Sequence, residues 1–142
     1  MVVPPPDIDD DFVYRATIVK WVDGDSVWLR LEKEFEIDIG FRIWQVVTCY
    51  TEQNFRLADI NAPEMRGPTR EAGQAALDFL RLVLEEQEVL ARTEKTGKYG
   101  RYLVHLYALE DDGQATDVNQ TMVESGHAVK YGEPVPNRWK NS

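Results

Sequence analysis

Apolar residues in the first third of the chain follow the pattern of β-strands. Residues 12–22 are rich in β-branched and aromatic types, the turn residues Asp23-Gly24-Asp25 follow, and a second such run covers residues 26–32. Two runs of this kind around a turn with glycine predict a β-hairpin. Residues 35–60 keep a strand composition without a helical period, so they are predicted to form further strand, bent near Gly40 and again before Phe55.

A helical period begins only after residue 67. Residues 61–64 (Asn-Ala-Pro-Glu) interrupt the strand pattern and are predicted to form a loop, and Pro68 suits the first turn of a helix. The apolar residues that follow are spaced by three and four positions, which predicts an amphipathic helix. These residues are Ala72, Ala75, Ala76, Phe79, Leu80, Val83 and Leu84.

The last third of the chain again favours strands, closed by a short helix. Residues 89–93 and 101–109 are predicted strands, and Asp117 suits the N-cap of a helix over 118–125 that Gly126 would end. Strands, a helix, strands and a helix in this order predict an α+β fold. A small, partly open β-barrel of the OB type fits the order.

The length of 142 residues fits one domain. Residues 1–11 are predicted to be an acidic, proline-rich tail, residues 12–132 the folded domain, and residues 133–142 an irregular C-terminal tail. No apolar run approaches the roughly 20 residues of a membrane helix. The N-terminal residues lack the features of a secretory signal, so a cytoplasmic protein without membrane contact is expected. The single cysteine, Cys49, excludes an intrachain disulfide and is predicted to be a small core residue.

The net charge of −9 is unevenly distributed along the chain. Fourteen of the 25 acidic residues fall in four runs, over residues 7–11, 32–38, 85–88 and 110–112. By contrast, residues 92–101 carry four basic residues and one acidic residue. The chain can therefore present a locally basic groove on an acidic body, but a long non-specific DNA footprint is disfavoured.

Three short segments carry candidate chemistry. Asp23-Gly24-Asp25-Ser26 can present two carboxylates to a hard cation, although Asp-Gly is also an ordinary hairpin turn. In residues 55–64, strand alternation places Arg56 opposite Phe55 and Leu57, facing either a groove or plain solvent. In residues 98–101 (Lys-Tyr-Gly-Arg), the arginine fork suits phosphate oxygens, although a basic hairpin turn has the same composition.

Together with residues 118–126, where Val-Asn is followed by Val123 and Gly126, these segments resemble the staphylococcal nuclease (thermonuclease-like) family in type and order. The resemblance spans roughly residues 13–131, and residues 39–41 (Ile-Gly-Phe) look like a branch common among bacteriophage and actinobacterial members. It implies a five-stranded OB-type β-barrel with about three helices. It also implies a calcium-dependent nuclease of low sequence specificity that accepts DNA and RNA. A preference for single-stranded substrates and a monomeric state are expected in addition.

The resemblance also implies roles for individual residues. Asp25 matches a metal-ligand aspartate, Asn61 stands where a second such aspartate is usual, and Ala62 stands where a threonine lends its backbone carbonyl. Glu64 matches the residue that holds or deprotonates the attacking water. The remaining matches concern the substrate: Arg56 and Arg101 bind phosphate, Lys98 and Tyr99 lie near the terminal phosphate, and Tyr131 stacks on a base.

Asn61 is a departure from the family pattern, because an amide oxygen can ligate calcium but brings no charge. Two alternatives therefore stay open. The first is a working metal-dependent phosphodiesterase with weakened metal affinity. The second is a domain with weakened or lost chemistry that binds single-stranded nucleic acid or a protein partner.

Overall fold

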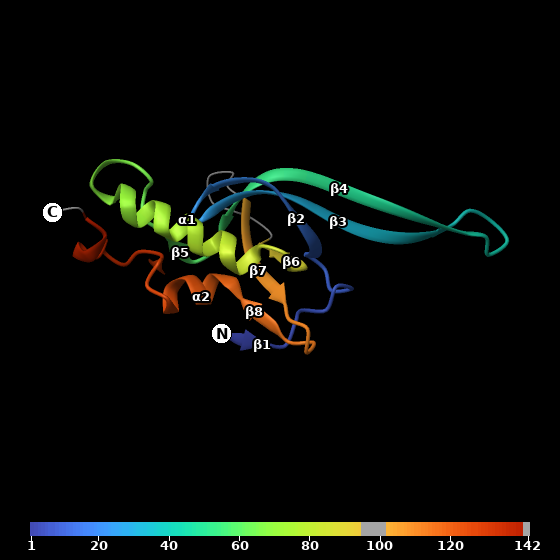
Figure 1. The fold of residues 1–142 in the computed structure, drawn as a ribbon. Coiled ribbons are helices and arrows are strands. Elements are labelled where there is room, and N and C mark those ends of the chain that lie inside the picture. Colours follow the sequence, from blue (N-terminus) through green and yellow to red (C-terminus); the bar gives the residue numbers. More distant parts are fainter. Residues whose placement is uncertain (95–101, 141–142) are drawn as a thin grey trace.

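The computed structural model describes residues 1–94 and 102–140 as a mixed α+β fold (Figure 1). Its described elements comprise nine strands, two α-helices and two single-turn 3-10 helices, against about three helices expected. The strands are β1 (Val2–Val3), β2 (Val13–Asp23), β3 (Ser26–Asp38), β4 (Trp44–Leu57), β5 (Ile60–Asn61), β6 (Val89–Thr93), β7 (Tyr102–Leu109), β8 (Ala115–Asp117) and β9 (Val129–Lys130). The helices are η1 (Gly67–Thr69), α1 (Arg70–Leu84), α2 (Val118–Glu124) and η3 (Asn137–Trp139).

The main sheet curls into a partial ring. Its order is β1-β8-β7-β4-β3-β2-β6, and β6 also pairs with β7. All of these pairings are antiparallel except that of β4 with β7, which is parallel and joins residues 55–57 to 102–104. The strands β5 and β9 form a separate two-stranded pair beside the ring. The strand runs and turn signals in the sequence therefore led correctly to an α+β fold.

The core lies inside the ring and beneath the two helices. Helix α1 buries the stripe Gly73, Ala76, Leu77, Leu80 and Leu84. This stripe is rotated from the predicted one, because Leu77 is buried and Ala75 is exposed. Helix α2 begins as predicted, since the side chain of Asp117 accepts a hydrogen bond from the backbone N–H of Gln120 at 3.1 Å.

Three predictions from the sequence are wrong: one about a bend, one about burial and one about the N-terminal tail. The strand expected to bend near Gly40 instead reverses there, so that β3 and β4 form a long hairpin that projects from the body (Figure 1). Cys49 lies on this hairpin and is exposed rather than in the core. Part of the expected N-terminal tail is ordered: Val2 and Val3 pair with β8.

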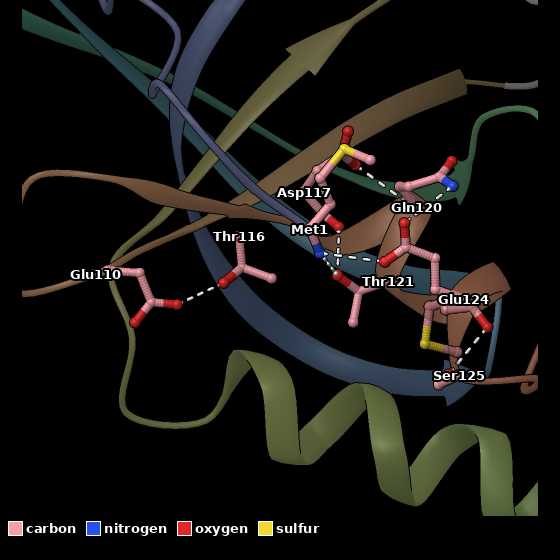
Figure 2. Close-up of polar contacts among 9 residues, drawn as sticks. Met1, Glu110, Thr116, Asp117, Gln120, Thr121, Glu124 and Ser125 are labelled. Atoms are coloured by element: carbon pink, nitrogen blue, oxygen red, sulfur yellow. Dashed lines mark hydrogen bonds and ion pairs between the residues drawn. The ribbon is translucent and has the colours of Figure 1, made fainter.

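The N-terminus is held by contacts with α2 and β8, which Figure 2 shows. The carbonyl of Met1 accepts a hydrogen bond from the backbone N–H of Asp117 at 2.8 Å, and its amino group donates to the hydroxyl of Thr121 at 2.9 Å. Glu124 lies 3.5 Å from the same amino group.

None of the helices in the described part of the chain is long and apolar enough to cross a membrane.

Candidate active site

The turn between β2 and β3 brings Asp25 into a partly enclosed position. The backbone N–H of Asp25 donates to the carboxylate of Asp23 at 3.1 Å, which stabilises the turn. A Cβ atom on Gly24 would lie 2.7 Å from the Cβ of Ala76 and 2.8 Å from the Cβ of Ala62. Only glycine therefore lets the turn approach α1 and the 61–64 loop this closely. As a result Asp25 is only 9% exposed.

The end of β4 supplies Arg56. Phe55 and Leu57 are buried while Arg56 is half-buried on the opposite face, as strand alternation predicts. The backbone N–H of Leu57 donates to the carbonyl of Asp25 at 2.8 Å and so holds β4 against the turn. The Nη2 atom of Arg56 donates to the amide oxygen of Asn61 and lies 3.8 Å from Oδ2 of Asp25.

The loop that follows β5 carries Ala62 and Glu64. The backbone N–H of Ala62 donates to Oδ2 of Asp25 at 2.9 Å, which ties the loop to the turn. Gly73 of α1 lies against the loop, since a Cβ atom there would be 2.5 Å from the carbonyl oxygen of Glu64. The Glu64 carboxylate is 74% exposed and lies 3.7 Å from Arg66.

These residues line one pocket of about 560 Å³. Asp25, Arg56, Asn61, Ala62 and Glu64 all contribute to its wall. The structure thus brings together five of the predicted site residues from the β2–β3 turn, β4, β5 and the following loop.

The C-terminal segment forms another wall of this pocket, which the sequence analysis missed. Trp139 and Lys140 line the pocket, and Trp139 is 5% exposed. The indole N–H of Trp139 donates to the carbonyl of Gly126 at 3.2 Å. The sequence contained one indication of this contact, because Trp139 is a large apolar residue in a segment predicted to be an irregular tail.

The electrostatics of the pocket centre on Asp25. Burial raises the pKa of Asp25 to about 7, and the neighbouring Asp23 side chain adds to the increase. The N–H of Ala62 and the guanidinium of Arg56 oppose it by favouring the ionised form. Ionising the Asp25 carboxylate in the folded protein therefore costs free energy, and a bound cation would offset this cost.

The groups around Asp25 fit a hard cation better than a soft one. The available donors are oxygens: the Asp23 and Asp25 carboxylates, the Asn61 amide and the Ala62 carbonyl, all on the pocket wall. Calcium and magnesium prefer such oxygens, whereas zinc favours nitrogen and sulfur. The Asn61 oxygen accepts a hydrogen bond from Arg56, so the guanidinium and a metal ion would compete for it.

The remaining predicted site residues lie elsewhere or outside the described residues. The ring of Tyr131 is 71% exposed, and the Arg56 guanidinium lies 5.8 Å from its centroid. Tyr131 is thus beside the pocket, with an open face for stacking. Lys98, Tyr99 and Arg101 fall in residues 95–101, outside the described residues, so their roles remain predictions.

A second group of possible metal ligands lies outside this pocket. One ligand atom each of Asp59, Glu94 and His105 lie within 4.8 Å of one another, and Nε2 of His105 is 3.2 Å from Oε1 of Glu94. Asp59 and Glu94 are exposed, so water already solvates their carboxylates. This group contacts neither Asp25 nor Arg56 in the polar interactions of the described residues.

Comparison with known protein families gives a match. The family described as staphylococcal nuclease homologue matches residues 54–141, which is more than half of the chain. The matched stretch includes Arg56, Asn61, Ala62 and Glu64 but begins after Asp25, near the end of β4. No curated protein with which the sequence was compared matches it significantly.

Proposed function

The chain belongs to the staphylococcal nuclease homologue family, a family of nucleases, and on that premise we propose that it is a calcium-dependent nuclease with low sequence specificity. We also propose single-stranded DNA or RNA as its substrate and an OB-type barrel as the form of its partial ring. The observation that carries the proposal is the convergence of Asp25, Arg56 and Glu64 on one pocket.

Each residue of the pocket has a proposed task in phosphodiester hydrolysis. Asp25, Asn61 and the carbonyl of Ala62 would hold the calcium ion, which when bound supplies positive charge to a phosphate oxygen. The Arg56 guanidinium would bind the phosphate and neutralise charge that grows on it in the transition state. Glu64 would accept the proton of the attacking water as one P–O bond forms and the other breaks.

The substrate strand would be held by contacts around this centre. Tyr131 would stack on a base, which gives affinity without sequence preference. Lys98, Tyr99 and Arg101 are proposed, on the family resemblance, to bind phosphates. The alternative function, a binding module without chemistry, would use the arginines but has no evident use for the Glu64 carboxylate.

A cleavage assay on a labelled single-stranded DNA, with calcium varied into the millimolar range, tests the proposal. We expect cleavage by the wild type with calcium and none with a chelator. Arg56→Ala and Glu64→Gln should reduce turnover about 100-fold, since losing one transition-state contact of this kind costs roughly 2–4 kcal/mol. Arg30→Ala is the matched control, because Arg30 of β3 pairs with Glu32 of the same strand and with Glu52 of β4, away from the pocket.

Two outcomes would contradict the proposal. If Arg56→Ala and Glu64→Gln both kept the activity of the wild type, cleavage would not take place in this pocket. A wild type that binds the strand without cutting it at any calcium concentration would favour the binding module.

The amide of Asn61 provides a separate test of the metal assignment. Asn61→Asp should tighten calcium binding and raise activity at low calcium, because a second carboxylate beside Asp25 increases the attraction for a hard cation. Calcium titration by calorimetry measures this, with Asn54→Asp on the exposed part of β4 as the control. Equal affinity of wild type and Asn61→Asp would remove Asn61 from the proposed metal shell.

A further inference from the structure

The β3–β4 hairpin extends beyond the sheet as a two-stranded arm, here defined as residues 33–49. The strand β2 pairs with β3 only as far as Glu32, and β7 pairs with β4 only at residues 55–57. In the described part of the chain, the arm strands therefore pair only with each other, and Figure 1 shows them projecting away from the body. An isolated two-stranded ribbon is marginally stable in water.

The two faces of the arm differ in charge. Directly paired residues share a face, and the register pairs Phe35 with Val47 and Ile37 with Gln45. Ile39 and Ile43, joined by a backbone hydrogen bond of 2.9 Å, continue this apolar face toward the tip. The opposite face carries the acidic residues Glu34, Glu36 and Asp38, together with the exposed side chains of Trp44 and Val46.

The tip of the arm exposes an aromatic ring on an unfavourable backbone. Phe41 is 101% exposed and has a φ of 53°, and Arg42 follows with a φ of 60°. Bulky residues rarely adopt this left-handed conformation, which glycine or asparagine would adopt at lower cost. A strained and fully exposed phenylalanine points to a contact outside this chain.

An aromatic cleft of about 510 Å³ lies at the base of the same apolar face. Its walls include Phe12, Tyr14, Leu31, Phe35, Phe55 and Tyr102. Phe12 is 43% exposed and Tyr102 is 55% exposed, so the cleft is open to solvent. The cleft and the apolar face form one continuous surface, because Phe35 belongs to both.

We propose that this surface binds a second copy of the chain, with two arms packed antiparallel across a two-fold axis. In that arrangement the tip of each arm lies at the base of the other, so each Phe41 enters the partner's aromatic cleft. Such an interface is isologous, since each copy contributes both tip and cleft. The arm lies outside the family match at residues 54–141, so the proposal concerns this chain rather than the family.

The exposed area of the apolar face is large enough for a second copy of the chain to bind. Phe35, Ile37, Ile39, Phe41 and Ile43 are each 48% exposed or more. Side chains of this size offer on the order of 600 Å² per copy together, so two faces would bury about 1,200 Å², which reaches the size of a specific interface.

The charge of the arm favours a second copy of the chain as its partner over a nucleic acid or an anionic membrane. Packing apolar face on apolar face leaves Glu34, Glu36 and Asp38 of both copies in water. A nucleic acid or an anionic membrane would meet those carboxylates with like charge. A membrane would also take up only the tip, whereas the apolar face runs from Phe35 to Ile43.

Light scattering of the full chain after gel filtration, over a range of concentrations, tests the proposal. We expect a dimer for the wild type and a monomer for Ile37→Lys. Val46→Lys is the matched control: Val46 is 60% exposed at the same height of the arm but on the acidic face, and this variant should stay dimeric. A monomeric wild type, or a dimer that survives Ile37→Lys, overturns the proposal.

Disulfide trapping tests the geometry independently of stability. In a Cys49→Ser background, a Phe41→Cys chain mixed with a Tyr14→Cys chain should form a mixed disulfide under mild oxidation. A Val46→Cys chain in place of Phe41→Cys should not. A dimer without the expected disulfide, or a monomer that binds vesicles of neutral lipid through its tip, contradicts the proposed packing.

Discussion

At the scale of single residues, the pocket depends on a buried carboxylate that is costly to ionise. Asp25 is enclosed by the turn, by Ala62 and by Arg56, and it has Asp23 beside it. Stability is given up here in favour of a group that a cation can use, as is common in functional sites. The cost should be measurable in the metal-free protein.

We expect the pH dependence of stability to report this cost. The folded-state pKa of Asp25 is about 7, against an ordinary value of 3.8 for an aspartate, so the folded protein retains a proton that the unfolded chain releases. The Asp25 contribution therefore destabilises the folded state progressively as pH rises from about 4 to about 7, and then levels off. At pH 8 Asp25→Asn should raise the free energy of unfolding by up to about 4 kcal/mol, at 1.36 kcal/mol per pKa unit.

Urea denaturation with a chelator, from pH 4.5 to pH 8, measures the effect. The stability difference between Asp25→Asn and wild type should grow with pH, whereas Asp78→Asn on the exposed face of α1 should show no such trend. At pH 8, added calcium should stabilise the wild type and leave Asp25→Asn unchanged. A pH-independent difference would mean that Asp25 is ionised in the folded protein at every pH tested.

At the scale of secondary structure, elements with local signals were predictable and those with distant partners were not. The Asp23-Gly24-Asp25 hairpin, helix α1 and the Asp117 cap follow from neighbouring residues. The turn after Ile39 lacks an Asn-Gly pair and uses Phe41 and Arg42 at positive φ, so Gly40 alone predicted a bend and not a reversal of the chain. Burial of Trp139 and pairing of Val2 with Thr116 depend on contacts that no local pattern encodes.

The candidate site also combines features with local sequence signals and features that depend on distant contacts. The spacing of Arg56, Asn61 and Glu64 along one strand and loop made their proximity predictable, because only a few residues separate them. The role of α1 was not predictable, since it depends on how closely Gly24 and Gly73 let other backbone approach. These two glycines position the site without offering any chemical group.

Gly73→Ala should therefore impair the site more than the fold. Its Cβ atom would lie 2.5 Å from the Glu64 carbonyl oxygen and 2.9 Å from the Cα of Met65, and backbone atoms cannot rotate away. We expect turnover to fall at least 10-fold as the loop shifts, because an error of about 1 Å in a catalytic group can cost 100-fold. Cleavage kinetics and urea denaturation on the same samples separate the two effects.

The control for this variant is Ala75→Gly, at an exposed position of the same helix. It should cost about 1 kcal/mol of stability through helix propensity and leave turnover unchanged. If Gly73→Ala kept wild-type turnover, the close contact between α1 and the loop would have no part in positioning Glu64.

At the scale of the whole molecule, charge and shape divide the protein into two regions. One is the pocket, where the basic residues Arg56, Arg66 and Lys140 lie among four acidic ones, Asp23, Asp25, Glu64 and Glu133. The other is the arm, with an apolar face and an acidic face. The net charge of −9 repels nucleic acid at long range, so attraction has to come from a few contacts close to the pocket.

This division predicts a shallow salt dependence for binding of single-stranded DNA. Each phosphate contact adds about 0.7 to the slope of log affinity against log salt, so two to four contacts give a slope between about −1.4 and −2.8. Replacing Glu34 and Glu36 with glutamine should leave both the affinity and the slope nearly unchanged at moderate salt, because the arm contacts no phosphate and charges more than a Debye length from the strand are screened. Fluorescence anisotropy with an uncleaved oligonucleotide measures both quantities. A slope near −10, or a slope that steepens in the glutamine variant, would mean that the strand runs along the arm as well as the pocket.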